Sequence, residues 1–351
     1  MYKILSILSA LSVAVLALGV AGSNPALAQE VQGPKVNWKY NVWGKQRAFT
    51  KGVETMAEIV SDKTGGNFTI KIYYGDQLGG KKQNLDNLKA GVFDMAQICS
   101  SYHPGKNTAL TVLNLPFLPI KNPDVEAAVH EAVYDHPVVK KQLAEKWNSF
   151  ALMSSLLPQY EFLGKGPAPT SLDGFKGMSV RALGGLGDAM EKLGARKNTV
   201  TATEVYTAID RGTVTAVSFP FTYAHVSYKI NEVADWFTSN LSPGTVDCPT
   251  IVSLTSWNGL PKQYREMMIA AKQPAYAALK AAYKKADEKN LPMFIAKMQA
   301  IEYSDEQLAQ FRKVGGAPVW HDWVNKHKGE FDAQGLLDHV MTTATVANQK
   351  Q

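Results

Sequence analysis

The feature that most constrains this chain is a repeated alternation of short apolar strands and amphipathic helices. The residues at 37–43 predict a strand, and the helix that follows carries apolar side chains at three-to-four spacing. A second strand, at 68–73, alternates apolar and polar residues. A helix that stops at Gly91 then leads into a third strand at 94–99. This β-α-β-α-β order predicts an α/β lobe with a parallel-rich sheet and flanking helices.

The same alternation begins again in the middle of the chain. The elements predicted there are, in order, a helical region at 125–147, a strand at 152–157, a loop at 164–174, a strand at 178–180, a helix closed by Gly194, a helix at 204–211 and a strand at 214–219. Two α/β lobes in tandem are therefore expected. The crevice between two such lobes is the usual place for a ligand.

The N-terminus predicts export. Residues 1–28 combine Lys3, an apolar run at 4–20 and the small-residue ending Ala26-Leu27-Ala28, which is typical of a signal peptide cleaved after Ala28. The alternative is a membrane anchor. It is less favoured because the run is short, rich in Ala, Ser and Gly, and not followed by a basic cluster. We expect a periplasmic protein whose 323 remaining residues exceed what one hydrophobic core usually supports.

The last third of the chain is predicted to be helical. A long helix at 262–298 should be interrupted at Pro274 and Pro292, and Ser304 and Gln307 form a capping box for a later helix. A long helix after two lobes could brace them against each other. The domains expected are lobe I at 29–158 with a return segment at about 238–260, lobe II at 159–237, and bracing helices at 261–351.

Composition excludes some classes of function. The net charge of +6 comes from scattered lysines and not from a basic block, so no nucleic-acid partner is expected. A mildly positive field would attract an anionic solute, although the same charge serves solubility alone. The sequence lacks a Gly-x-Ser-x-Gly elbow, a His-Glu-x-x-His motif and a Walker loop, so no cofactor, metal or enzymatic activity is expected.

Arg181 is the first candidate for a binding residue. It ends the predicted strand at 178–180 and is followed by a glycine turn and a helix, which places it at the edge where α/β folds bind ligands. Its planar fork of donors suits a carboxylate. Aromatic residues beside other strand ends could form the walls of the crevice, or could be lobe core: Trp43, Tyr102, Phe219, Tyr223 and Trp257. Glu161 could meet a cationic group of the ligand, or could be a solvated loop carboxylate.

Cys99 and Cys248 are the only cysteines. In an oxidising compartment they could pair, but a separation of 149 positions says nothing about their distance in space. Two buried thiols are the alternative, and the sequence leaves both open.

Six segments together carry a family resemblance. They are Gly75-Asp-Gln-Leu-Gly79, Leu88-Lys-Ala-Gly91-Val-Phe-Asp94-Met95, Leu115-Pro-Phe-Leu118, the run from Leu172 to Arg181, the run from Glu204 to Gly212, and Trp257-Asn-Gly-Leu-Pro261. In this order and spacing, the chain after residue 28 resembles the solute-binding proteins of TRAP (tripartite ATP-independent periplasmic) transporters, the DctP family.

The resemblance implies a two-lobe, periplasmic-binding-protein-like (type II) α/β fold with crossing strands and a long bracing helix across both lobes. It implies that Arg181 pairs with the carboxylate of a small organic acid. It also implies a monomeric receptor that delivers this acid to the membrane permease subunits and catalyses nothing. An exported enzyme acting on a small organic acid, or a solute-sensing module for a receptor kinase, are the alternatives.

Two positions depart from the family pattern. Phe219 stands where a solute-contacting Asn is common, and Ser218 where Glu is common. A ring in place of an amide removes hydrogen-bonding capacity and adds an apolar wall. This departure favours a carboxylate or sulfonate with an apolar or aromatic body over a sugar acid. A zwitterion would fit if Glu161 lined the pocket.

Overall fold

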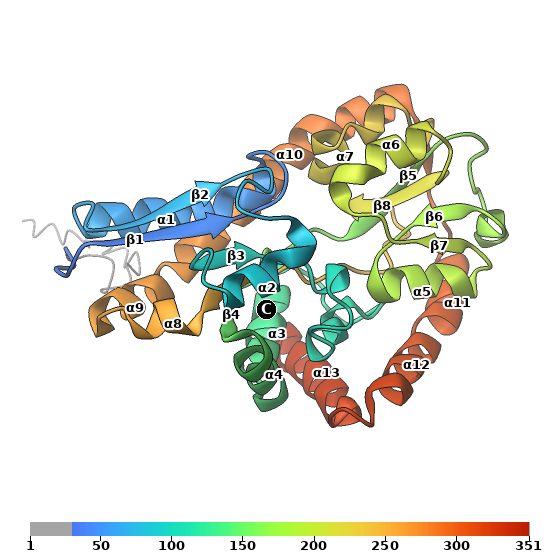
Figure 1. Cartoon of the computed structure of the whole chain (residues 1–351). Helices are drawn as coiled ribbons and strands as arrows, with labels where there is room; N and C mark the ends of the chain where they lie inside the picture. The colour runs from blue at the N-terminus through green and yellow to red at the C-terminus, as the bar shows by residue number, and fades with distance from the viewer. Residues whose placement is uncertain (1–29, 351) are drawn as a thin grey trace, which may run out of the picture.

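The computed structural model describes residues 30–350, so the expected signal peptide and its cleavage site lie outside the described residues. Two α/β lobes lie side by side, each built on one sheet, and a long helix runs across both (Figure 1). The predicted two-lobe α/β fold is confirmed. Over residues 30–350, none of the helices combines the length and apolar character that a membrane span requires.

Lobe I contains a five-stranded sheet in the order β2-β1-β3-β10-β4. Its strands are β1 (Val36–Asn41), β2 (Phe68–Tyr73), β3 (Met95–Gln97), β4 (Ser149–Met153) and β10 (Thr250–Ser253). Its helices are α1 (Lys51–Lys63), α2 (Asn84–Lys89), α3 (Pro123–Asp135) and α4 (Pro137–Trp147). β1 is parallel to β2 and β3, as the alternation predicts, but β10 is antiparallel to both β3 and β4. The sheet is mixed because β10 returns from lobe II in the opposite direction.

Lobe II contains a six-stranded sheet in the order β11-β9-β5-β8-β6-β7. Its strands are β5 (Tyr160–Gly164), β6 (Ser179–Arg181), β7 (Arg196–Asn198), β8 (Ala216–Pro220), β9 (Trp236–Thr238) and β11 (Gln299–Ile301). Its helices are α5 (Gly184–Lys192), α6 (Val205–Asp210) and α7 (Tyr223–Ser227). β6 lies parallel between β7 and β8, so its carboxyl end lies beside the carboxyl ends of both neighbours.

Two extended segments cross between the lobes. Residues 154–159 lead from β4 to β5, and residues 239–249 lead from β9 back to β10. One hydrophobic cluster continues through this crossing and includes Met56 of α1, Leu157 of the first segment and Val217 of β8. The lobes therefore share buried apolar surface where the chain passes from one to the other.

The long helix is α10 (Lys272–Lys297), which follows α8 (Leu254–Asn258) and α9 (Lys262–Ala270). Lys272 and Tyr276 near its start both bond Glu131 on α3 of lobe I. Toward its end, Asp287 accepts hydrogen bonds from the amide nitrogen and the hydroxyl of Thr222 in lobe II, at 2.8 and 2.9 Å. The helix is thus tied to both lobes.

Three further helices complete the chain: α11 (Asp305–Gly315), α12 (Ala317–His327) and α13 (Ala333–Gln349). α11 and α12 pack against α5 of lobe II, whereas α13 packs against α3 of lobe I (Figure 1). The predicted capping box at the start of α11 is confirmed. Ser304 Oγ accepts from the amide of Gln307, and Gln307 Oε1 accepts from the amide of Ser304 at 2.9 Å.

Some predicted boundaries are wrong. The helix does not break at Pro292, which lies inside α10. The interruption predicted near Pro274 falls at Ala271, between α9 and α10. The strand expected at 152–157 ends at Met153, because the residues after it form the crossing segment. The helical region at 125–147 is divided at His136, where Pro137 starts α4.

Candidate functional site

A small cavity lies between the lobes, beside the crossing segments. Its volume is about 30 Å³. Lobe I lines it with Trp43, Arg47, Phe49, Cys99 and Tyr102; the crossing segments with Leu157 and Cys248; and lobe II with Tyr160, Arg181, Leu183, Ala202, Phe219, Pro220, Tyr223, Ala224 and Tyr228. The two positive charges of the lining are guanidinium groups, and the rest of the wall is mainly aromatic.

Arg181 reaches this cavity from the end of β6 and is fully buried. Its Nε donates to Val200 O at 3.1 Å and its Nη1 donates to Ser218 O at 2.8 Å. Its Nη2 is buried and has no hydrogen-bond partner. Within residues 30–350 no carboxylate forms an ion pair with Arg181. A buried, uncompensated cation with free donors is a site for an anion.

Phe219 holds this guanidinium from one side. The Cζ atom of Arg181 lies 4.5 Å from the centre of the Phe219 ring, which is a cation–π contact. Phe219 in turn stacks on Tyr228, with ring centroids 5.3 Å apart and an interplanar angle of 25°. The guanidinium is therefore fixed by two carbonyls and one ring, and its free Nη2 has a defined position.

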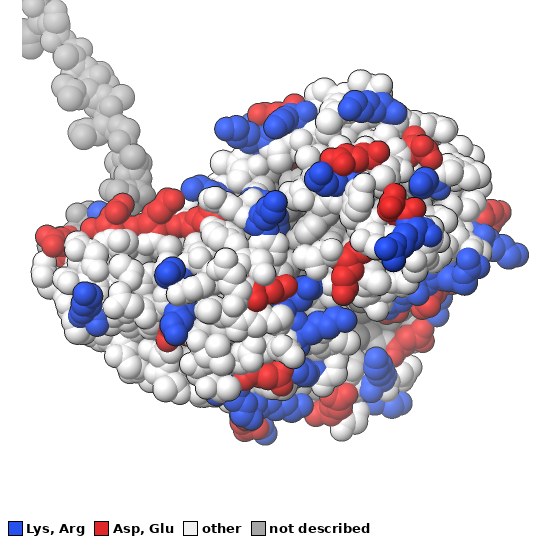
Figure 2. Space-filling view, turned by 45° about the horizontal axis from the view of Figure 1, so that its top comes forward, with Lys and Arg blue, Asp and Glu red and all other residues white. Residues whose placement is uncertain are grey.

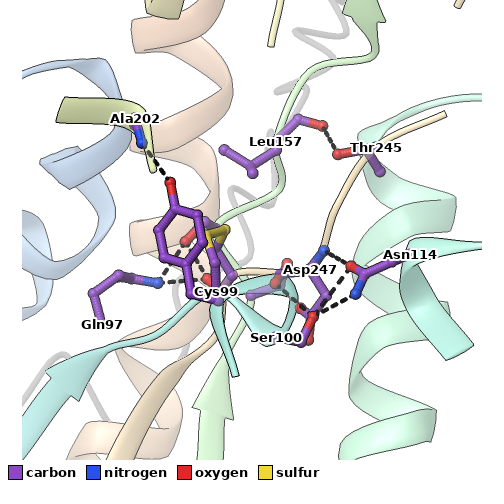
Figure 3. Close-up of a disulfide and its surroundings, with 12 residues drawn as sticks. Gln97, Cys99, Ser100, Asn114, Leu157, Ala202, Thr245 and Asp247 are labelled. Carbon is purple, nitrogen blue, oxygen red and sulfur yellow. Dashed lines mark hydrogen bonds between the residues drawn. A yellow bond between two sulfur atoms is a disulfide. The ribbon is translucent and has the colours of Figure 1, made fainter. Parts of the chain in front are cut away.

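The wall on the side of lobe I is aromatic. The ring of Trp43 lies 5.4 Å from that of Phe49 and 5.6 Å from that of Tyr102. The hydroxyl of Tyr102 accepts a hydrogen bond of 2.9 Å from the amide of Ala202, and this bond joins lobe I to lobe II (Figure 3). Tyr102 therefore lines the cavity and also forms a hydrogen bond between the two lobes.

Cys99 and Cys248 form a disulfide in the wall of the cavity (Figure 3). Cys99 follows β3, and Cys248 belongs to the second crossing segment. The carbonyl of Cys248 accepts from Gln97 Nε2 at 2.5 Å and from Ser155 Oγ at 2.6 Å. The disulfide and these bonds fasten both crossing segments to the end of β3, so the choice that the sequence left open is decided in favour of pairing.

The structure brings five of the seven predicted site residues to the cavity. These are Arg181, Phe219, Tyr223, Trp43 and Tyr102. Trp257 is elsewhere. It belongs to α8 and packs edge-on against Phe150 of β4, with ring centroids 5.0 Å apart. The sequence placed it beside a strand end or loop, but it lies in α8, which packs against β10 and β4 and does not line the cavity.

Glu161 is also not in the lining of the cavity. It lies within β5, where successive side chains face opposite sides of the sheet, and Tyr160 takes the cavity side. The Glu161 carboxylate accepts from Thr238 Oγ at 2.5 Å and from the amides of Leu241 and Ser242 at 3.2 and 3.0 Å. Burial raises the pKa of Glu161 to about 7. Glu161 thus fastens the second crossing segment, and the geometry gives no support for a zwitterionic ligand.

Sequence reasoning missed Arg47, Tyr160 and Tyr228. Arg47 lies in the loop that follows β1, so the rule that selected Arg181, a cation beyond the carboxyl end of a strand, could have selected it too. Tyr228 directly follows α7, the helix that begins with the predicted site residue Tyr223. Tyr160 is the first residue of a fully buried strand and carries no comparable signal.

The chemistry of the lining suits an organic anion. Burial raises the pKa of Tyr160 and of Tyr223, so both phenols stay neutral. Across residues 30–350 there is no group of three or more His, Cys, Asp or Glu side chains placed to hold a metal ion. Acidic and basic side chains are interspersed over the face seen in Figure 2.

Comparisons with known proteins agree with this geometry. The family model for "Bacterial extracellular solute-binding protein, family 7" (DctP) matches residues 41–327. A monocarboxylate 2-oxoacid-binding periplasmic protein of Nostoc sp. is 26% identical over 287 residues, which cover 80% of this chain and 78% of the relative.

Two solved structures show the same fold. A TRAP solute-binding protein from a marine metagenome, specific for aromatic acid ligands and crystallised with 3-hydroxybenzoate, matches with a TM-score of 0.78 at 20% identity, over 90% of this chain and 99% of that one. A TRAP solute-binding protein of Rhodoferax ferrireducens with copurified benzoate matches with a TM-score of 0.76 at 20% identity, over the same shares. The family match confirms what the motifs predicted: this chain belongs to the DctP family of bacterial extracellular solute-binding proteins.

Proposed function

We propose that this chain is the periplasmic receptor of a TRAP transporter. It captures a small organic acid between its lobes and delivers it to the membrane permease subunits, acting as a monomer after cleavage of its leader at Ala28. The family assignment supports the class of protein. The observation that carries the ligand class is the free, buried Nη2 of Arg181, which no carboxylate of the described residues neutralises.

The proposed solute is a carboxylate with a small apolar or aromatic body. The aromatic walls support this, because a sugar acid needs many polar partners for its hydroxyl groups. The Phe219 ring contacts the Arg181 guanidinium and lines the cavity. It therefore presents an apolar surface at the position where the family often has an asparagine. The relatives are divided, since some bind 2-oxo acids or aromatic acids and others bind galacturonate or glucuronate, so the lining of the cavity is what supports the apolar body.

A screen followed by one substitution tests the proposal. Thermal-shift measurements over aromatic carboxylates, 2-oxo acids and sulfonates should reveal binders, since a ligand at a hundred times its Kd adds about 2.7 kcal/mol of stability. Arg181→Met should then weaken the best binder about a thousandfold in calorimetry, because a charge-assisted pair in a desolvated site is lost. Arg196→Met, on the neighbouring strand β7 but exposed, is the matched control and should bind normally.

Equal affinity of the Arg181→Met protein and the control would contradict the proposal that Arg181 binds the carboxylate of the solute. Conversion of the best binder by the purified protein would favour the alternative of an exported enzyme. Retention of the full-length chain in the cytoplasmic fraction of cells would contradict the proposed leader.

A further inference from the structure

A second polar region of the cavity lies where the two lobes meet. Arg47 comes from the loop after β1 in lobe I, and Tyr228 follows α7 in lobe II. The Cζ atom of Arg47 lies 5.7 Å from the centre of the Tyr228 ring and 4.6 Å from that of Phe49. Both residues line the cavity. Their contact joins the lobes and therefore forms when the lobes are closed.

Gly44 shows how closely these groups approach. A Cβ atom added at Gly44 would lie 3.0 Å from Arg47 Nη1 and 3.1 Å from Tyr228 Oη, so these two polar atoms are neighbours beside the glycine. Gly44 also has a φ of +69°, a conformation that residues with a side chain rarely adopt. The glycine thus leaves room for an arginine and a phenol from opposite lobes to meet.

Both groups keep donors that the protein does not use. Arg47 Nη1 donates to Trp43 O at 2.9 Å and to Lys45 O at 2.7 Å, but its Nε is buried without a partner. The hydroxyl oxygen of Tyr228 is buried and makes no hydrogen bond of normal length. Burial raises the pKa of Tyr228, while Arg47, the side chain of Trp43 and Arg181 lower it by less. The indole of Trp43 can only donate to the phenol oxygen, so Tyr228 keeps its own proton to donate.

Arg47 and Tyr228 lie apart from Arg181, the proposed binding residue for the carboxylate. Arg181 lies over Phe219, Phe219 stacks on Tyr228, and Arg47 contacts Tyr228. A stacked pair of rings therefore connects the two guanidinium groups. No ion pair neutralises Arg47 within residues 30–350. One cavity thus offers an anion site in lobe II and a second set of donors where the lobes meet.

We propose that Arg47 and Tyr228 determine specificity by selecting acids that carry a second hydrogen-bond acceptor, an oxo or hydroxyl oxygen, away from the carboxylate. The inference rests on the proposed function, since the carboxylate on Arg181 sets where the second oxygen lies. An acid without that oxygen leaves two buried donors unpaired when the lobes close, and such unpaired groups are costly. Discrimination against a missing polar group is strong for this reason.

Matched pairs of acids test the inference. The probes are benzoate with 3-hydroxybenzoate, phenylacetate with 3-hydroxyphenylacetate, and pentanoate with 4-oxopentanoate, each measured by calorimetry. We expect the native protein to bind the oxygen-bearing member of at least one pair about tenfold more tightly. Tyr228→Phe, which keeps the stacked ring, and Arg47→Lys, which keeps the charge, should each reduce that ratio to about one.

Tyr264→Phe is the matched control. Its hydroxyl donates to Pro34 O at 3.0 Å and lies outside the lining of the cavity, so its loss should leave the ratio unchanged. A native ratio near one in every pair, or a ratio that survives both substitutions, overturns the inference while Arg181-dependent binding stands. If no acid binds, or if binding ignores Arg181, the proposed function fails and this inference fails with it.

Discussion

Asp247 is a buried carboxylate directly before the disulfide cysteine Cys248, in the core of lobe I. Tyr134 Oη donates to its Oδ1 at 2.5 Å, and His130 Nδ1, which bonds Ser154 Oγ at 2.7 Å, lies 3.6 Å from the same oxygen. Burial raises the pKa of Asp247 to about 7 and that of the nearby Glu126 well above its usual value. Burial also lowers the pKa of His130 to about 3. The cluster is therefore largely uncharged at mildly acidic pH.

This cluster predicts how stability depends on pH. Unfolded, Asp247 loses its proton near pH 3.8, whereas folded it keeps it to about pH 7, so the folded state binds more protons between these values. The free energy of unfolding should then fall as pH rises through this range. His130 acts in the opposite direction, but only between about pH 3 and 6.5. The buried His103 and His225 act in the same direction as His130, and the effect of all three fades above pH 6.5 as the unfolded histidines lose their protons. The carboxylates then dominate, and unfolding at pH 8 should be easier than at pH 6.5.

Asp247→Asn should flatten this dependence, by up to about 1 kcal/mol between pH 6.5 and 8. Glu126 and Glu161, whose pKa values are also raised by burial, would contribute what remains. Urea unfolding at several pH values measures the effect, with the exposed Asp135→Asn as a control of equal charge change. A dependence that is the same in both variants would show that Asp247 is not the group responsible.

Single residues show where sequence reasoning works and where it fails. The place of Arg181 in the cavity was predictable, because it stands at the end of a strand of an α/β lobe, where such folds leave a crevice. Glu161 was misplaced because β5 is buried on both faces and shows no alternation, so the sequence does not tell which side of the strand a residue takes. Arg47 and Tyr228 could not be paired from sequence, since they meet only through the docking of the lobes.

At the scale of elements, the contact between α1 and the long helix α10 is unusually close. Gly52 of α1 faces Leu279 of α10, and a Cβ atom added at Gly52 would lie 2.7 Å from Leu279 Cδ1 and 2.8 Å from its Cγ. The two helices pack more closely at this point than a side chain on α1 would allow. Glycine at position 52 lowers the intrinsic stability of α1, but it allows α1 and α10 to pack closely.

Gly52→Ala should destabilise the protein, because overpacking costs about 1–3 kcal/mol and exceeds the gain of about 1 kcal/mol in helix propensity. In the double variant with Leu279→Ala, the combined loss should be smaller than the sum of the single losses. Chemical denaturation of the four proteins gives this coupling energy. Gly105→Ala, whose added methyl meets nothing within 4 Å, is the control. Additive losses would show that the contact is not tight.

The elements themselves were predictable in proportion to their length and periodicity. β2 was predicted with its observed bounds, because 68–73 alternates cleanly. The strands β7, β9 and β11 have three residues each, and they exist because a neighbouring strand pairs with them. Pro292 does not end α10, which shows that packing against both lobes can outweigh one lost backbone hydrogen bond.

At the scale of the whole molecule, the lobes are held by two crossing segments, α10 and the disulfide. The disulfide closes a loop of 149 residues and fastens a crossing segment to β3. Two lobes in tandem followed from chain length and alternation. A return of the chain to lobe I was expected at about 238–260. The antiparallel pairing of β10 and the pairing of β11 with β9 were not, because local sequence does not encode which distant strands pair.

Replacing both cysteines by serine should lower the free energy of unfolding by about 2–5 kcal/mol, the range expected when a long loop is released. It should also weaken ligand binding, since the disulfide forms part of the cavity wall. Guanidinium unfolding and calorimetry measure the two effects. The native protein treated with a reductant should behave like the double variant. Unchanged stability in both would contradict a structural role for the disulfide.

The position of the disulfide also has a consequence for timing. Thiols stay reduced in the cytoplasm and pair after export. A newly made chain therefore carries two separate thiols where the finished receptor has part of its binding wall. If the chain is exported as proposed, capture of the solute would be tied to arrival in the compartment where transport starts, and precursors still inside the cell would bind the imported acid less well.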